Sequence, residues 1–353
     1  MRVGRRAKTL IFLWAAALVW LSGPFLRAES IPCVFADVDK IVAVGDLHGD
    51  YQNLVKILTG TRLVDEGLRW TGGRTHLVQT GDILDRGPAA RQIFDLLIRL
   101  EQEAEQAGGR VHVLIGNHEE MTLAGISLDY PGFVTVDQFQ SFLPDAYVEE
   151  KVAKFVQKKA AALPAGAEPP PISFAELQEY WQKIMDEDED ARAEYFRFLR
   201  AHYGPWLLGR NGVLKINDIV FAHGGLSESF AGIPLEKLNA LLRHELNLAM
   251  RGASFRPRIL FVRNSPLWYR DLALSDEKAI AKEVDRILGK LKARHMVIAH
   301  SPHGFGTVRS MERLGGRIWV IDTGISAHYG GHYSALIIDR QKYTPWGVMN
   351  GGK

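Results

Sequence analysis

An apolar run passes directly into two possible metal ligands in the sequence IVAVGDLHGD, which occupies residues 41–50. Its first four residues are apolar and mostly β-branched, which predicts a short buried strand. Gly45 then permits a sharp turn, so Asp46 and His48 fall in the loop beyond the carboxyl end of that strand. Ligands gather at this end of the strands in α/β sheets.

The same arrangement recurs further along the chain. Residues 76–79 and 111–115 are short, mostly apolar runs that lead into Gly-Asp and Gly-Asn, and two later runs end in His223 and His300. Two helical patterns separate the first three strands, as parallel strand–helix–strand units require, at residues 51–58 and 91–106. The strings that carry the polar residues are GDLHGD (45–50), GDILDRG (81–87), GNHE (116–119), HGG (223–225) and AHSPH (299–303).

These strings supply six expected metal ligands. Asp46 and His48 lie two residues apart on a turn and are able to converge on one ion. Asp82 is the expected bridge to a second ion, because one carboxylate can give an oxygen to each of two ions ~3.5–4 Å apart. The ligands expected to hold that second ion are Asn117, His223 and His300.

The ligand types indicate which metals to expect. Carboxylate and imidazole suit two divalent ions such as manganese, with iron or zinc as alternatives, and the single cysteine, Cys33, cannot form a thiolate site. A water between two such ions loses a proton near neutral pH. The sequence therefore predicts a metal-bridging hydroxide that attacks the substrate directly, with no covalent enzyme intermediate.

The five strings together resemble the calcineurin-like metallophosphoesterase superfamily, and specifically its Ser/Thr-type phosphoprotein phosphatases. The segments PLWYR (266–270), DTG (322–324) and YGG (329–331) are more similar to the bacterial, Shewanella-like phosphatases. The resemblance covers roughly residues 40 to 340 and implies an α/β fold, a β-sandwich flanked by helices in α/β/β/α layers. Two features depart from the eukaryotic enzymes: no C-terminal Tyr-containing loop is recognisable, and the interval between Asn117 and His223 is much longer.

The resemblance also assigns roles to residues beside the ligands. It implies that His118 is the general acid that protonates the leaving alkoxide, with Asp85 holding the imidazole in position. Arg86 can grip two phosphate oxygens in a bidentate fork. Further substrate phosphate-binding candidates are Asn117, Arg270 and Tyr329. We interpret three other histidines near the site as structural or surface residues, namely His303, His328 and His332.

We expect a metal-dependent phosphomonoesterase of the phosphoprotein-phosphatase type. Hydrolysis of a small molecule, such as a nucleotide or dinucleoside polyphosphate, by the same site is the alternative. A single Asp or His is usually structural. Five such strings in the expected order, each in its predicted context, instead indicate a metal site. A binding module with a dead site is disfavoured because every expected ligand is present. A net charge of +2 argues against nucleic acid as a partner, which leaves a phosphorylated protein or small molecule.

The N-terminus predicts export. Four basic residues within the first eight precede the uninterrupted apolar stretch Leu10–Leu21, and this pattern is typical of a secretory signal. We therefore expect residues 1–28 to engage the export machinery and to direct the protein to the periplasm or the medium. An uncleaved membrane anchor is the competing interpretation, although the stretch is short for a spanning helix of about 20 residues. The oligomeric state is left open.

The remainder is expected to be one catalytic domain at 38–345, with a helical insertion at 127–209 that limits access to the site. Residues 160–171 are rich in Ala and Pro and predict an irregular linker. The acidic run at 186–190 is interpreted as a solvated helix N-terminus. The helices expected around these features span 135–142, 145–159, 173 to about 183, and 191–203.

Overall fold

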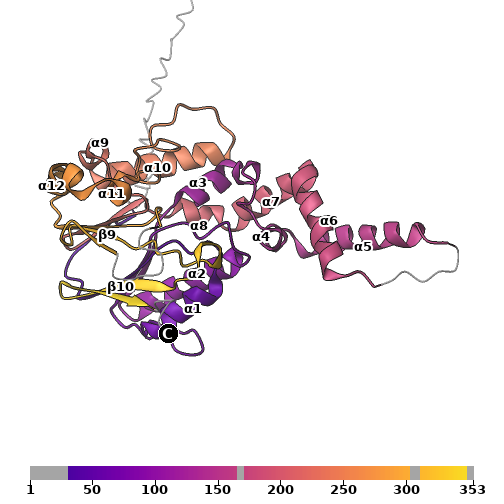
Figure 1. Cartoon of the computed structure of the whole chain (residues 1–353), viewed down its shortest axis with the longest axis horizontal. Helices are drawn as coiled ribbons and strands as arrows, with labels where there is room; N and C mark the ends of the chain where they lie inside the picture. Colours follow the sequence, from indigo (N-terminus) through magenta and orange to yellow (C-terminus); the bar gives the residue numbers. More distant parts are fainter. Residues whose placement is uncertain (1–30, 165–170, 303–310, 348–353) are drawn as a thin grey trace, which may run out of the picture. The chain divides into compact units, whose positions relative to one another are not determined.

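The computed structural model describes residues 31–164, 171–302 and 311–347. Two β-sheets pack against each other, and helices cover their outer faces (Figure 1). The first sheet has six strands in the order β1-β5-β6-β7-β9-β8, and the second has five in the order β11-β10-β2-β3-β4. The predicted α/β/β/α architecture is therefore confirmed. The predicted export segment, residues 1–28, lies outside the described residues.

The strands are short and follow the predicted apolar runs closely. They are β1 (Val34–Phe35), β2 (Lys40–Val44), β3 (His76–Gln79), β4 (Arg110–Val113), β5 (Val213–Ile216), β6 (Ile219–Ala222), β7 (His295–Ile298), β8 (Glu312–Arg313), β9 (Ile318–Val320), β10 (Ser334–Asp339) and β11 (Lys342–Gly347). Strands β2, β3 and β4 are parallel neighbours, and so are β6, β7 and β9. Within each of these two sets, the carboxyl ends consequently meet at one edge.

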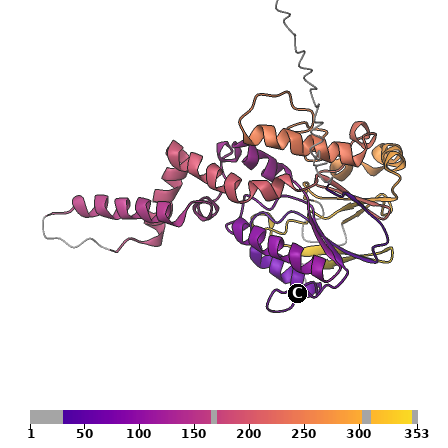
Figure 2. The same ribbon diagram turned by 180° about the vertical axis from the view of Figure 1, so that it is seen from behind.

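The helices occupy the connections between strands. They are α1 (Tyr51–Gly60), α2 (Ala90–Gln106), α3 (Asn117–Ala124), α4 (Val136–Ser141), α5 (Asp145–Ala161), α6 (Phe174–Glu187), α7 (Glu189–His202), α8 (Gly204–Leu208), α9 (Glu228–Ala231), α10 (Leu235–Met250), α11 (Asp271–Leu274) and α12 (Glu277–Leu291). The described residues also form the 3-10 turns η1 (Ser127–Asp129) and η3 (Ala327–Tyr329). Figure 2 shows α1 and α2 beside the five-stranded sheet, and α10 on the side of the six-stranded sheet.

Strand β2 shows why the first apolar run has no polar face. Ile41 and Ala43 belong to the apolar layer between the two sheets, together with residues such as Phe221. Val42 and Val44 point the other way, into the layer under the helices. All four side chains are buried. A strand buried on both faces has a nearly continuous apolar sequence, so the uninterrupted run is consistent with the position of β2 in the middle of the fold.

One predicted strand is shorter than expected. The apolar run 111–115 was expected to be a single strand, but β4 ends at Val113. Leu114 then forms a bridge with Asn211, and the Ile115 N–H donates to the Asn211 carbonyl at 3.0 Å. The chain leaves the five-stranded sheet at this point because its backbone finds partners in the residues just before β5.

The described residues between 127 and 209 form helices α4 to α8 and the turn η1, and Figure 1 shows α5 and α6 projecting away from the two sheets. Helix α6 runs four residues beyond the expected end near Lys183, as far as Glu187. The acidic run therefore spans a helix junction. Only its later part lies at a helix N-terminus, where the Asp188 side chain accepts from the Ala191 N–H at 3.0 Å. Its first two residues end α6 instead.

Among the residues that the structure describes, no helix is both long enough and apolar enough to cross a membrane.

Candidate metal centre

The loops after β2 and β3 are tied together by their backbones. The N–H groups of Leu47 and His48 both donate to the Asp82 carbonyl, at 3.0 and 2.9 Å, and the Gly49 N–H donates to the Ile83 carbonyl at 2.8 Å. These bonds fix the two ligand-bearing loops side by side. The first two strings of the sequence thus form one unit at the carboxyl edge of the five-stranded sheet.

Glu119 fastens the same unit to α3. Its buried carboxylate accepts from the backbone N–H groups of Asp82 and Ile83 at 2.8 Å, and from that of Gly116 at 2.9 Å. This glutamate stands in the GNHE string but was not among the predicted site residues. Its geometry shows that it shapes the loop that carries Asp82.

Several site residues adopt left-handed backbone angles that side chains other than glycine rarely take. Such conformations cost of order 1–3 kcal/mol each and persist only where the surroundings enforce them. They are enriched at functional sites, and five site residues adopt them here, although other such residues lie in turns elsewhere in the described structure. The five site residues are His48 (φ 43°), Asp82 (φ 56°), Asp85 (φ 70°), Arg86 (φ 67°) and His300 (φ 65°).

Two histidines are oriented by backbone carbonyls. His48 Nδ1 lies 2.9 Å from the Leu84 carbonyl oxygen, and His223 Nδ1 lies 3.0 Å from that of Thr80. A ring N–H that donates to a carbonyl leaves the other nitrogen as a free acceptor, the arrangement found for metal-ligating histidines. In both residues Nε2 is therefore the atom available for an ion.

The Asp82 carboxylate belongs to two clusters of possible ligand atoms. Its Oδ2 atom lies 3.3 Å from His223 Nε2, 3.7 Å from His48 Nε2 and 3.9 Å from His118 Nε2. His300 completes the cluster that contains His223. All these residues are buried. A single carboxylate shared by two histidine-rich groups is the arrangement that a dinuclear metal site needs.

Asn117 joins the cluster that contains His223. Its Oδ1 atom lies 2.9 Å from His223 Nε2, and His300 Nδ1 lies 3.1 Å from the same nitrogen. Three of the atoms expected around the second ion therefore converge on one point. The cluster around His48 differs from the predicted ligand set, since it contains His118 where Asp46 was expected.

Asp46 lies between the two sheets' ligand loops. Its Oδ2 accepts from the His300 N–H at 3.1 Å, and its Oδ1 lies 3.6 Å from His223 Nδ1. Asp46 Oδ1 is buried and has no hydrogen-bond partner among the described residues. Buried polar atoms are almost always paired, so an unpaired carboxylate oxygen beside the other expected ligands fits the coordination of a cation.

Sequence reasoning missed Asp322 as a site residue. It follows β9 just as the other ligands follow their strands, and the apolar run before DTG was the signal that could have located it. Burial and the nearby carboxylates of Asp322 and Asp82 raise the pKa of Asp46 well above its usual value. Burial likewise raises the pKa of Asp322 to about 6. Crowded carboxylates of this kind are stabilised by a bound cation.

Two of the expected ligands, His48 and His300, are held in the neutral form that binds metal. Burial, together with the neighbouring His118, lowers the pKa of His48 to about 3. Burial and His223 also hold the pKa of His300 well below its usual value. Metal ions compete with protons for imidazole nitrogen, so a neutral ring favours binding. The buried Asp, Asn and His donors therefore fit two divalent ions.

His118 and Asp85 form a buried pair. His118 Nδ1 lies 2.6 Å from Asp85 Oδ2, so the ring N–H donates to the carboxylate. Burial disfavours a charged His118 ring, but the Asp82 and Asp85 carboxylates outweigh this effect and raise the pKa of His118. A histidine that keeps its proton near neutral pH is suited to general-acid work. The structure thus brings together the two residues of the predicted acid pair.

The predicted phosphate-binding residues lie around this centre. Arg86 Nη1 donates to the Gly132 carbonyl at 2.9 Å, and the guanidinium stacks over the Phe133 ring at 4.1 Å. Tyr329 is half-buried, with its ring 5.3 Å from that of His48. Arg270 is exposed, and its Nη1 donates to the His300 carbonyl at 2.6 Å.

The remaining histidines near the site differ in what the structure says of them. His328 is exposed, with its ring 4.7 Å from that of Tyr329. His303 lies outside the described residues.

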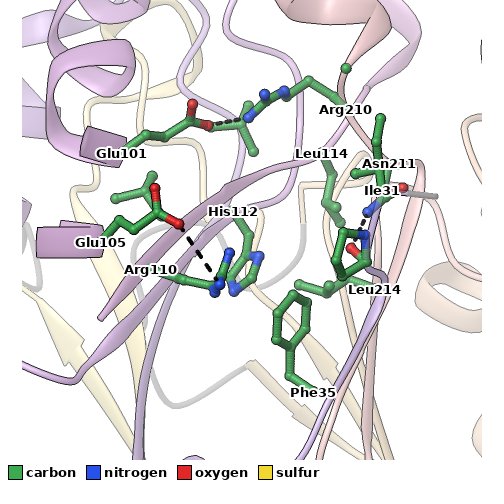
Figure 3. Close-up of a pocket in the computed structure, with 14 residues that line it drawn as sticks. Ile31, Phe35, Glu101, Glu105, Arg110, His112, Leu114, Arg210, Asn211 and Leu214 are labelled. Carbon is green, nitrogen blue, oxygen red and sulfur yellow. Dashed lines mark hydrogen bonds and ion pairs between the residues drawn. The ribbon is translucent and has the colours of Figure 1, made fainter. Parts of the chain in front are cut away.

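A separate cavity lies away from these residues and contains none of the expected ligands. Figure 3 shows that its charged side chains pair with one another. Arg110 lies 3.9 Å from Glu105, and Arg210 pairs with Glu101. Because its two arginines pair with glutamates of the same chain, this cavity is a weaker candidate for phosphate binding than the metal centre.

Comparison with known proteins agrees with the geometry. The model of the calcineurin-like phosphoesterase family matches residues 39–333. Shewanella-like protein phosphatase 2 of Arabidopsis thaliana is 30% identical over 257 residues, which cover 70% of this chain but only 61% of that protein. Shewanella-like protein phosphatase 1 of Plasmodium berghei is 26% identical over 312 residues, which cover 86% of this chain and 72% of that protein.

Solved structures show the same fold. The cold-active protein-tyrosine phosphatase of a psychrophilic Shewanella species superposes with a TM-score of 0.60 at 24% identity, covering 90% of this chain and 82% of that one. The chain belongs to the calcineurin-like phosphoesterase family. Its fold and its two metal-compatible clusters define a metal-dependent hydrolase of phosphoric esters. The resemblance inferred from the five strings, including that to the Shewanella-like phosphatases, is confirmed.

Proposed function

We propose that this protein removes phosphate from phosphorylated proteins, with two Mn²⁺ ions held by the six residues predicted from the sequence. The observation that carries the proposal is the Asp82 carboxylate, which lies within 3.3 to 3.9 Å of histidine nitrogens on both sides. The ligands are Asp46, His48, Asp82, Asn117, His223 and His300. When bound, the two ions activate water and offset the charge of the phosphate.

The protein's own groups then handle the substrate. In this proposal Arg86 binds two phosphate oxygens, and Arg270 and Tyr329 contact the same group. The contacts of Arg270 with His300 and of Tyr329 with His48 support this role. As the bond from phosphorus to the leaving oxygen breaks, the His118 Nε2 proton passes to that oxygen. Asp85 holds the other ring nitrogen and stabilises the charged ring before transfer.

A phosphoprotein substrate is supported over a nucleotide by the names of the relatives, which are protein phosphatases. The test is a panel of phosphopeptides, nucleotides and p-nitrophenyl phosphate, assayed with Mn²⁺ on the purified protein. We expect the highest kcat/KM on a phosphopeptide. A higher kcat/KM on a nucleotide would assign the site to small-molecule chemistry instead.

We also propose that the protein is exported through residues 1–28. The basic residues before the apolar stretch Leu10–Leu21 support this proposal. N-terminal sequencing of protein recovered from a cell fractionation tests it. Export predicts a periplasmic or secreted product that begins near Glu29, and an intact N-terminus in the cytoplasmic fraction would contradict it.

A further inference from the structure

Gln138 touches the acid pair from a segment that carries none of the five strings. It lies in the first turn of α4 and is fully buried. Its Nε2 donates to Asp85 Oδ1 at 2.9 Å, and its Oε1 accepts from the Asp85 N–H at 2.7 Å. The backbone N–H can only donate, so the amide has one possible orientation.

The amide is itself held from α7. Gln138 Nε2 also donates to the Tyr195 hydroxyl oxygen at 3.0 Å. The Tyr195 ring is fully buried, stacked on Phe139 at 5.3 Å and edge-on to Phe142 at 5.9 Å. Thr135 caps α4 by accepting from the Gln138 N–H at 3.2 Å. Gln138 thus uses both polar atoms of its side-chain amide in a buried environment.

The pair needs this support because a carboxylate that holds a histidine can rotate. Asp85 Oδ2 receives the His118 N–H, and Gln138 fixes the other oxygen, Oδ1. Two contacts on one carboxylate set its plane, and this plane directs the imidazole of His118. Partners one step removed from a functional histidine commonly matter by about 10–100-fold in metalloenzymes.

We propose that Gln138, anchored by Tyr195, is a positioning residue for the His118–Asp85 pair. Helices α4 and α7 are then part of the machinery that delivers the proton. This inference rests on the proposed function, because it needs His118 to protonate a leaving group. It adds a residue that acts through Asp85 and does not contact substrate.

The test is Gln138→Met, which keeps the length of the side chain and removes its hydrogen bonds. Turnover should be measured on phenyl phosphate, whose phenolate is a poor leaving group, and on p-nitrophenyl phosphate, whose p-nitrophenolate is a good one. We expect kcat on phenyl phosphate to fall about 10–100-fold, with a much smaller fall on p-nitrophenyl phosphate. KM and metal content should stay at the wild-type values.

Tyr195→Phe should cause a smaller loss of the same kind, which keeps the test open if the methionine variant folds poorly. Its matched control is Tyr203→Phe, which removes a hydroxyl bonded to Asp95 at 2.7 Å, just beyond the end of α7. This control should leave the ratio of the two rates unchanged. A fall of equal size on both substrates in the Gln138 and Tyr195 variants would show a merely structural role and overturn the proposal.

A double variant gives the sharpest discrimination. If Gln138 acts through His118, then Gln138→Met should cost nothing further in a His118→Asn background, because coupled residues are not additive. Additive losses would overturn the proposal while leaving the phosphatase function intact. Wild-type protein that hydrolyses neither aryl phosphate would overturn the proposed function itself.

Discussion

Replacing His118 by asparagine separates the two roles that its position allows. Its Nε2 lies 3.9 Å from Asp82 Oδ2. Two ligand atoms each about 2.0–2.2 Å from one ion lie no more than about 4 Å apart, so this distance fits a ligand as well as an acid. The bond from Nδ1 to Asp85 also suits both roles. Metal content must therefore be measured together with turnover.

We expect His118→Asn to retain about two ions per chain, as two-metal sites require. Turnover of a phosphoserine peptide should fall by the roughly 10²–10⁴-fold that a general acid supplies. This loss corresponds to about 3–5 kcal/mol of activation free energy. The loss should shrink for p-nitrophenyl phosphate, whose leaving group is already a good anion.

The matched control for this substitution is His112→Asn. His112 Nε2 lies 3.0 Å from His76 Nδ1, and His112 lines the separate cavity of Figure 3. It should leave both turnover and metal content unchanged. Loss of an ion from the His118 variant alone would show that His118 is a ligand, and the assignment of the general acid would then be wrong.

Two further substitutions test the acid pair and the phosphate contact. The pKa of His118 is raised above the usual histidine pKa of 6.5, so the protonated ring should persist to higher pH. We therefore expect kcat on a phosphoserine peptide to fall only as the pH rises through this raised pKa. Asp85→Asn should move this alkaline limb of the kcat profile to lower pH, and an unmoved limb would contradict the pairing. Arg86→Lys should weaken inhibition by inorganic phosphate about 10–100-fold, because the bidentate fork is lost. Arg91→Lys is its control, since Arg91 also stacks on a phenyl ring and donates to a carbonyl, and equal inhibition constants in the two variants would exclude a phosphate contact for Arg86.

The sequence predicted the parts of the site that depend on local patterns. Val42 and Val44 are buried beneath the helices and Ile41 between the sheets, so an apolar run followed by Gly-Asp was enough to place Asp46. The same pattern precedes Asp322, which was overlooked because DTG was used only as a mark of the family. The position of Asp322 was therefore predictable from its local sequence.

Other features depend on contacts between distant parts of the chain. Gln138 meets Asp85 across 53 positions in the sequence, and nothing in its own neighbourhood signals that contact. The left-handed backbone angles of Asp82 and His300 are also invisible in the sequence, because these residues are not glycine. Both features arise because the tertiary fold enforces a geometry that the local sequence does not favour.

The junction between α6 and α7 shows that amino-acid composition alone does not predict where a helix ends. Five acidic residues in a row predicted one solvated N-terminus, yet α6 continues to Glu187. Its apolar face buries Trp181, Ile184 and Met185, and this packing extends the helix into the acidic run. The free energy of burial outweighs the unfavourable charge at the helix end.

The ratio of metal to protein, followed together with activity, tests the two-metal site most directly. The protein should contain two divalent ions per chain by elemental analysis after loading with Mn²⁺. Chelation should remove the ions and abolish hydrolysis of p-nitrophenyl phosphate, and Mn²⁺ should restore much of it. Full activity in protein that elemental analysis shows to be free of metal would contradict the account.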